Sequence, residues 1–365
     1  MDFINELTER VRQQIGLELT SDENFSFFQP AGNEHMVQFF YKNLSEEYWD
    51  LDMWNRHHLF LCDLPTKPDY EFVLDDDGRF ATLEHSDSKQ SKEVAAVMDL
   101  RDDYIVVVYY FGDSKICARI NQLLKASPNL HACYLGMSIF EQVVCELEQI
   151  THLEFDFEQQ SAMFSEPVNL KGTISGQPAQ LIYHQYLQNH KPFFNIQSIS
   201  GRISDESHGK VIFQFDGMAQ VDDCRLSDFM QIVKLLFLLL RLKYKSLADK
   251  CILKWSGTEE KNYISLDGNM IEFNLNKPIE KLEGLIRYLV KGDKQLLLYG
   301  SSERISRKLW SVKSINVNSK SQIELEVSDA MVRVYLKNRT SIPLLDSIED
   351  FIRKHIAADI ENSSF

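Results

Sequence analysis

The sequence predicts an α/β N-terminal domain with a short parallel βαβαβ core over residues 1–160. An α+β C-terminal domain over residues 161–365 is predicted to follow, with two βββα-like units around a buried helix. Three observations predict this fold class. Apolar runs alternate with amphipathic segments between residues 104 and 157, the alternation ends near residue 160, and two later stretches resemble each other.

The elements of the N-terminal domain follow from local patterns. YEFVL and RFATLEH on either side of DDDG predict a hairpin, and HHLFLCDL (residues 57–64) predicts a further strand. Farther along, the apolar runs IVVVYYF, HACYL and HLEFDF are separated by amphipathic segments of about a dozen residues. Such spacing is typical of parallel strands that are connected by helices, and it predicts the βαβαβ core.

A change of pattern places the domain boundary between residues 158 and 168, where periodicity is absent and Pro167 occurs. Beyond it, NIQSISGRI and KVIFQFDGMAQV predict adjacent antiparallel strands. The apolar segment 229–245 contains Lys234 and Arg241, and a membrane span needs about 20 largely uncharged residues. The segment therefore predicts a buried helix with Ser227 or Asp228 as its N-cap.

Residues 251–300 and 305–360 are predicted to be a duplicated βββα unit. Trp255-Ser256 in the first stretch matches Trp310-Ser311 in the second, and each stretch ends in an amphipathic helical pattern. The alternative is a chance likeness between amphipathic strands and helices. A true duplication predicts two small sheets that pack with pseudo-symmetry.

Composition and termini indicate a soluble, cytoplasmic protein without membrane insertion. The chain opens with an amphipathic helical pattern over residues 1–16 rather than a signal sequence. Its six cysteines lack CxxC spacing, so neither a disulfide framework nor a zinc site is expected. No resident metal or cofactor is predicted, except Mg²⁺ under the nuclease alternative given below.

Charge is distributed unevenly along the chain, whose formal net charge is −15. Residues 1–100 contain 8 Lys and Arg against 21 Asp and Glu, whereas residues 241–320 contain 16 against 9. Such asymmetry indicates electrostatic partners rather than a fold.

Basic and aromatic residues in the second of these windows predict a site for nucleic acid or another polyanion, because cations bind phosphates and aromatic rings stack on unpaired bases. The candidate residues are Arg241, Lys243, Tyr244, Lys245, Lys250, Lys254, Arg304, Arg307 and Lys308. In the alternative interpretation, the acidic N-terminal region meets this basic window, either within one chain or between the subunits of a homo-oligomer.

A second candidate site is the segment Phe111 to Lys115, which follows the most apolar predicted strand and opens a predicted helix. Backbone N–H groups at such a junction can bind an anion, and Gly112, Ser114 and Lys115 would form this site. The alternative is a glycine turn followed by an N-capping residue, which accounts for the same residues.

Pro68-Asp69, followed after fourteen residues by Glu84-His85-Ser86, resembles the acidic pair of PD-(D/E)xK nucleases. The resemblance implies that Asp69 and Glu84 hold Mg²⁺ and that a lysine polarises the attacking water. Ser86 stands where that motif has its lysine, so Lys89 is the remaining candidate for this role.

The leading functional hypothesis is a non-catalytic or accessory binding protein. Its C-terminal domain would contact nucleic acid or another polyanion, and its acidic N-terminal domain would engage a protein partner. The first alternative is a metal-dependent nuclease or phosphate-ester hydrolase in the N-terminal domain. The second is a protein-interaction subunit of a bacterial or phage-defence complex, a setting that no particular residue supports.

Overall fold

A computed structural model describes the chain between His35 and Ser363. Its longer gaps cover residues 87–91, 160–167, 185–193, 203–209, 258–263, 318–321, 337–341 and 353–359, and shorter gaps are scattered between them. The predicted helix at residues 1–16 lies outside the described residues. No helix within the described part of the chain is both long enough and apolar enough to cross a membrane.

The described secondary structure consists of helices α3 to α8 and strands β1 to β19. The helices are α3 (Met53–Cys62), α4 (Ser114–Lys125), α5 (Met137–Cys145), α6 (Gln177–Ile182), α7 (Leu226–Cys251) and α8 (Leu282–Lys291). The first eleven strands are β1 (His35–Lys42), β2 (Tyr70–Leu74), β3 (Phe80–Ser86), β4 (Lys92–Asp99), β5 (Ile105–Tyr110), β6 (Leu130–Ala132), β7 (Gln149–Gln159), β8 (Val168–Ser175), β9 (Phe194–Arg202), β10 (Lys210–Gln214) and β11 (Met218–Asp222). The remaining strands are β12 (Lys254–Gly257), β13 (Ile264–Asp267), β14 (Met270–Leu275), β15 (Leu298–Ser306), β16 (Leu309–Asn316), β17 (Gln322–Ser328), β18 (Met331–Leu336) and β19 (Ile360–Ser363).

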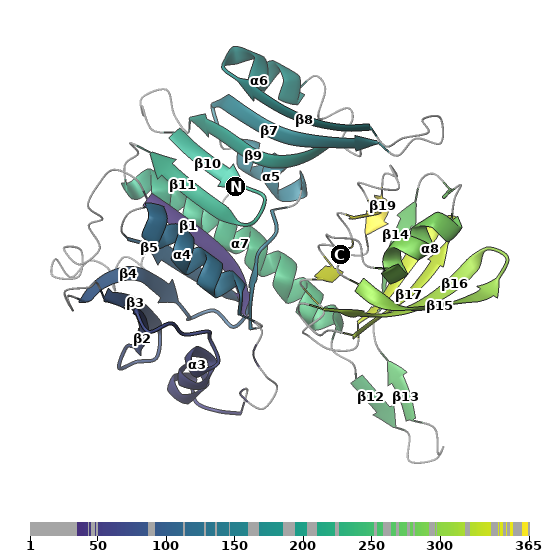
Figure 1. Ribbon diagram of the computed structural model, residues 1–365, viewed down its shortest axis with the longest axis horizontal. Coiled ribbons are helices and arrows are strands. Elements are labelled where there is room, and N and C mark those ends of the chain that lie inside the picture. The colour runs from purple at the N-terminus through teal and green to yellow at the C-terminus, as the bar shows by residue number, and fades with distance from the viewer. Residues whose placement is uncertain are drawn as a thin grey trace, which may run out of the picture.

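The first eleven strands form one large sheet in the order β2-β3-β4-β5-β1-β11-β10-β9-β7-β8, with β6 also pairing with β1. Strand β1 occupies the centre. The series β2 to β5 ends beside it on one side, and the series β9 to β11 ends beside it on the other. The side chains of β1 alternate between two faces. Phe40 packs with Val106 and Ile120 on the α4 side, whereas Phe39 and Tyr41 belong to the core on the α7 side. Helices α4 and α7 therefore cover opposite faces of the sheet (Figure 1).

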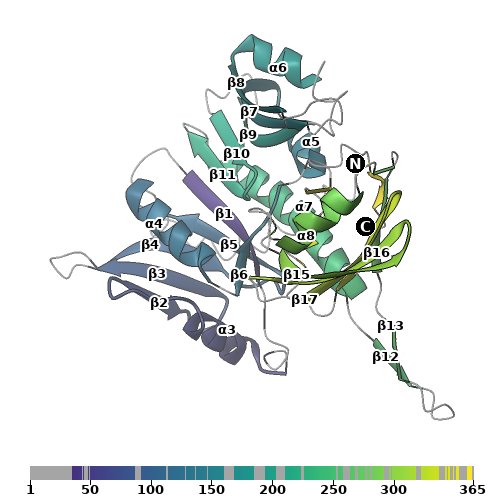
Figure 2. The same cartoon turned by 45° about the vertical axis from the view of Figure 1, so that its right-hand side comes forward.

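Helix α7 confirms the predicted apolar helix, and at 26 residues it is longer than the pattern indicated. It begins at Leu226, so the two proposed N-cap residues, Ser227 and Asp228, lie inside its first turn. Ile232, Leu236 and Leu240 are buried in the same core as side chains of both sheets. The helix runs along the large sheet and ends beside the smaller one (Figures 1 and 2).

Six of the later strands form a second sheet in the order β15-β16-β17-β18-β14-β19. Helix α8 lies against β15 and β16 on one face (Figure 2). On that inner face Val312, Leu325 and Val334 are buried. The outer face carries charged side chains at the intervening positions, such as Lys313 and Glu324, so this sheet shows the alternation typical of antiparallel sheets that face water on one side.

The predicted parallel βαβαβ core is wrong, although its strands and helices exist. β5, α4, β6, α5 and β7 follow one another as expected, but β5 and β6 both pair antiparallel with β1. The strand β1 thus lies between them, and β7 pairs with β8 and β9 elsewhere in the sheet. Periodicity identifies strands locally, but it does not report a strand from much earlier in the chain that inserts between two of them.

The predicted pair of equivalent βββα units is also wrong. In the first stretch, β12 and β13 form a separate two-stranded ladder, while β14 pairs with β18 in the six-stranded sheet. In the second stretch, β16, β17 and β18 are consecutive neighbours in one sheet. The β12–β13 hairpin projects away from the sheet (Figure 1), so the two stretches do not pack with pseudo-symmetry.

Residues 57–62 correct a further prediction, because they belong to helix α3 rather than to a strand. The Asp52 side chain caps the helix by accepting a hydrogen bond from the Asn55 backbone N–H. His57, Phe60 and Leu61 are buried at helical spacing, and the apolar run was short enough to fit either periodicity.

The predicted hairpin β2–β3 and the antiparallel pair β9–β10 are confirmed. The proposed domain boundary near residue 160 falls between β7 and β8, which are hydrogen-bonded neighbours in the large sheet.

Candidate functional site

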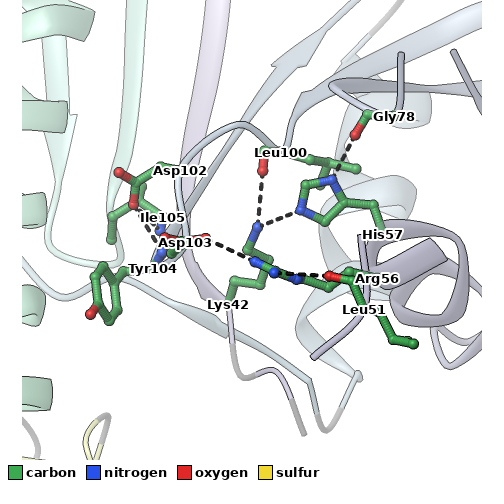
Figure 3. A network of polar contacts seen from close by, with 10 residues as sticks. All are labelled: Lys42, Leu51, Arg56, His57, Gly78, Leu100, Asp102, Asp103, Tyr104 and Ile105. Atoms are coloured by element: carbon green, nitrogen blue, oxygen red, sulfur yellow. Dashed lines mark hydrogen bonds and ion pairs between the residues drawn. The ribbon is translucent and has the colours of Figure 1, made fainter. Parts of the chain in front are cut away.

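A buried polar cluster surrounds Lys42 at the end of β1 (Figure 3). Lys42 is only 2% exposed. The Lys42 Nζ donates to the Leu100 carbonyl oxygen at 2.9 Å and lies 3.0 Å from His57 Nε2. A buried ammonium is costly unless it is hydrogen-bonded, and these two acceptors come from the β4–β5 connection and from α3.

His57 connects this lysine to the β2–β3 turn. Its Nδ1 lies 2.6 Å from the Gly78 carbonyl oxygen. Because a carbonyl oxygen only accepts, Nδ1 carries the proton and Nε2 is left as the acceptor for Lys42. Gly78 has φ 71°, and a Cβ there would lie 2.7 Å from Trp54 Cα. The turn therefore requires glycine in order to dock against α3.

Burial shifts the acid–base properties of both groups. It lowers the pKa of Lys42 from 10.5 to about 8, while Asp103 and Asp102 act in the opposite direction. Burial, followed by the nearby charge of Lys42, lowers the pKa of His57 from 6.5 to about 4. At neutral pH the pair is thus a charged lysine donating to a neutral imidazole.

A second set of contacts extends from this cluster to α7. Arg56 Nη1 lies 3.3 Å from Asp103 Oδ1. Asp102 Oδ1 accepts hydrogen bonds from the backbone N–H groups of Tyr104 and Ile105, and Asp102 Oδ2 lies 2.6 Å from Arg241 Nε. The acidic loop at the end of β4 therefore meets the start of the basic window within the same chain.

The burial of the Lys42 cluster decides what it can do chemically. A lysine that acts on a substrate must be reachable, whereas Lys42 is enclosed and donates to two protein acceptors. The cluster instead links four chain segments, namely β1, α3, the β2–β3 turn and the β4–β5 connection. We infer a stabilising role for this cluster, which the sequence did not indicate because its members are distant along the chain.

The residues that resemble a nuclease site lie around the β2–β3 hairpin. Glu84 pairs in register with Glu71, and Lys92 Nζ lies 2.7 Å from Glu71 Oε2 and 3.3 Å from Glu84 Oε2. Asp69 is exposed, and Lys89 lies outside the described residues. Within the described chain, no group of three or more His, Cys, Asp or Glu side chains is placed to hold a metal ion. Metal-dependent hydrolysis stays a prediction. In the structure, the ammonium group of Lys92 lies beside the Glu84 carboxylate that would bind the metal ion.

The predicted anion site lies at the junction between β5 and the start of α4. Both sheet neighbours of β5 are antiparallel to it, and anion binding at this junction stays a prediction. Gly112 lies outside the described residues, as does the side chain of Ser114. Lys115 is exposed on the first turn of α4.

The predicted polyanion-binding residues are divided between α7, β12 and the β15–β16 hairpin. Among the described cations, Arg241 faces Asp102, Lys308 Nζ lies 2.6 Å from Asp329 Oδ2, and Arg304 Nη1 lies 3.8 Å from Glu283. These carboxylates reduce the positive field that would attract phosphates.

Further members of this set differ in their accessibility. Lys245 and Arg307 are exposed, Lys243 is partly buried, and the side chains of Lys250 and Lys254 lie outside the described residues. Tyr244 corrects the prediction of an exposed stacking ring, because it is 1% exposed. It stacks on Tyr41 with ring centroids 5.1 Å apart, and its hydroxyl accepts from the Tyr134 N–H. Tyr244 is therefore a core residue.

Strand β15 forms an accessible surface that sequence reasoning missed. It is the terminal strand of the six-stranded sheet, and among the described strands it pairs only with β16. Leu298 is buried, but each of the eight residues from Tyr299 to Ser306 is exposed. A strand edge of this kind presents backbone N–H and C=O groups that can pair with another chain.

Exposed apolar side chains concentrate at this edge. Tyr299 is 51% exposed, Ile305 55%, and on β16 and just beyond it Ile315 is 48% and Val317 55% exposed. Tyr299 lies directly opposite Ile315. We call Tyr299, Ile305, Ile315 and Val317 the edge cluster.

The remainder of the outer face is mainly polar, with Met270 on β14, 41% exposed, as an apolar exception. Lys313 Nζ lies 3.8 Å from Glu324, and Arg333 Nε lies 2.8 Å from Glu272. The Tyr335 hydroxyl donates to Glu326 at 3.0 Å. Apolar contact area on this face is therefore greatest beside β15.

A family model described as MJECL33-like protein matches residues 71–341, which is more than half of the chain. The chain belongs to this family. The matched range includes strands of both sheets, α7 and the whole of β15. No match to this sequence was found among curated proteins.

Proposed function

We propose that this member of the MJECL33-like protein family is a protein-binding subunit that takes an additional strand along β15. This proposal follows the interaction-subunit alternative from the sequence. The observation that carries it is the run of eight consecutive exposed residues on a terminal strand. In this type of recognition, main-chain hydrogen bonds supply affinity and side chains on one face supply specificity.

The other candidate sites have less support. The Lys42 cluster is buried, Lys92 lies between the two glutamates of the β2–β3 hairpin, and several cations of the basic set face carboxylates. By contrast, β15 has an accessible backbone and the edge cluster next to it. The ligand expected from this chemistry is an extended polypeptide with apolar residues at alternate positions.

A library of random ten-residue peptides displayed on phage, panned against the immobilised full chain, would test this function. Selected peptides should alternate apolar with polar residues. Their affinity would then be compared for wild type, Ser301→Pro and Ser302→Pro. Along a strand, successive residues direct their N–H groups to opposite sides. One proline therefore removes a donor from the open edge, and the other removes a donor to β16.

The expected result is a split between the two variants. The variant that loses the outward N–H should bind at least about tenfold more weakly with an unchanged thermal unfolding midpoint, because it forfeits one ladder bond. The other proline variant, which loses the N–H that donates to β16, should unfold at a lower temperature. Lys313→Ala, which alters the outer face of β16 without touching the edge backbone, is the matched control. Selected peptides whose affinity is the same for both proline variants bind elsewhere and contradict the proposal.

A further inference from the structure

One strand that could pair with the open edge of β15 is β15 of a second copy of this chain. Because an antiparallel pair of identical strands is related by a two-fold axis, β15 can add to β15 of a second copy only if its residues suit one another in reverse order. This inference rests on the proposed function, since it names the partner of the same edge.

Geometry restricts the registers that such a pair can adopt. The two-fold axis stands perpendicular to the sheet, so the outer faces of both copies stay on one side. Residues opposite each other must then come from the same face of the strand, which means that they are separated by an even number of positions. Tyr299 and Glu303 lie opposite Ile315 and Ser311 on the outer face, while Gly300 and Arg304 lie opposite Ser314 and Trp310 on the inner face.

Three registers centre on the middle of the strand, and side-chain chemistry separates them. Centring on Glu303 places two Glu303 carboxylates opposite each other, which is destabilising. Centring on Ser301 places Tyr299 opposite Glu303. Centring on Ser302 places Tyr299 opposite Ile305 of the second copy, Ser301 opposite Glu303 and Gly300 opposite Arg304.

The Ser302-centred register also accounts for the edge cluster. It produces two equivalent apolar rows in which Ile315 and Tyr299 of one copy continue into Ile305 of the other. The register between β15 and β16 shifts between Arg304 and Ser306, so Ile305 has no opposite residue on the described strand β16. On the inner face, the Arg304 guanidinium lies over the Trp310 ring at 5.8 Å from its centroid.

We propose that β15 pairs with β15 of a second copy of this chain, antiparallel and centred on Ser302. The two six-stranded sheets then form one continuous sheet of the dimer. The exposed Tyr299 and Ile305 side chains pack against each other twice. This pairing uses the same backbone edge that a foreign strand would use, so dimer formation and capture of an extended peptide compete.

The position of the two-fold axis can be tested by cross-linking the full chain. In this register Ser302 lies opposite itself, and directly opposite Cα atoms in antiparallel strands are about 4.5–5.5 Å apart, within the range of a disulfide. Ser302→Cys should therefore yield a covalent dimer under mild oxidation. Ser301→Cys is the matched control, because in this register residue 301 lies opposite Glu303 of the second copy rather than opposite another cysteine. Wild type measures the background from the exposed Cys62 and Cys145.

Sedimentation equilibrium of charge variants tests the side-chain pairing. Tyr299→Lys and Ile305→Glu should each raise the dimer dissociation constant about tenfold, because each variant loses two cross-strand pairs. The double variant places the introduced lysine of one copy opposite the introduced glutamate of the other, twice per dimer, and should recover most of that loss. An increase in affinity for Tyr299→Lys alone would indicate the Ser301-centred register and overturn the proposal.

The outcomes separate this inference from the proposed function. A chain that stays monomeric, with no Ser302→Cys cross-link, overturns the second copy as partner. If displayed peptides still lose affinity when the outward N–H of β15 is removed, the strand-binding function stands without dimerisation. If there is neither a dimer nor a loss of peptide affinity in this variant, both the β15–β15 pairing and the strand-binding function are rejected. A synthetic peptide with the sequence LYGSSERIS is expected to dissociate the dimer.

Discussion

The two sheets of this protein bury their strands in opposite ways. At the centre of the large sheet, β1 and β5 are covered on both faces, and even the polar side chains of Lys42 and Gln38 are buried. The six-stranded sheet is covered by α8 on one face, keeps a charged outer face, and ends in β15. The comparison indicates that stability concentrates around β1 and that binding capacity concentrates at β15.

Removal of an aromatic side chain at each location would test this division most strongly. Phe40→Ala, which empties a fully buried position on β1, should lower the free energy of unfolding by about 3–5 kcal/mol. Tyr299→Ala should change it by less than about 0.5 kcal/mol. Chemical denaturation of both variants measures these values. Equal losses would show that β15 is as important for stability as β1, contrary to the proposed division.

Lys42→Met is expected to change how stability depends on pH. Burial depresses the pKa of Lys42 from 10.5 to about 8, so the unfolded chain binds more protons than the folded chain between these values. Wild-type stability should therefore gain on the order of 3 kcal/mol as pH rises through this interval, relative to the variant. Denaturation at several pH values checks this, with the exposed Lys245→Met as control. Parallel pH profiles for wild type and Lys42→Met would contradict the buried position of the lysine.

His57→Gln should affect the acidic side of the profile. Because the pKa of His57 is lowered from 6.5 to about 4, its contribution to stability is present above pH 6.5 and is lost as pH falls toward 4. The variant should lose less stability over this interval than wild type does. His184→Gln, at a surface position, serves as the control and should follow the wild-type curve.

A small effect is expected at the contact between the large sheet and α7. Arg241→Ala removes the partner of Asp102 Oδ2, but Arg241 is about half exposed and Asp102 keeps its two backbone donors. We expect a loss of about 0.5–1 kcal/mol that diminishes at high salt. Lys245→Ala is the matched control on the same helix. A salt-independent loss would indicate that the packing of the Arg241 side chain, rather than its charge, stabilises the contact.

Several elements were predictable because their evidence is local. The apolar stripe of α7, the glycine turn between β2 and β3, and the amphipathic pattern of α4 are each contained in one short segment. The assignment of α3 failed because its apolar run is compatible with both periodicities; in the structure His57, Phe60 and Leu61 are buried at helical spacing, and the Asn55 N–H donates to the capping Asp52 side chain. Strand β15 was missed because LYGSSERIS has few apolar residues and no alternation. An edge strand that is exposed on both faces needs neither many apolar residues nor their alternation.

The amino-acid order by itself determined the positions of most strands and helices, the interrupted apolar character of α7 and the charge asymmetry of the chain. These properties depend on neighbours within a few turns or one strand. Only the tertiary structure decided that β1 separates β5 from β6, that Lys42, His57 and Leu100 meet, and that β15 ends a sheet. These properties depend on which distant segments pair, and the free energy of that pairing comes from the whole core rather than from any local pattern.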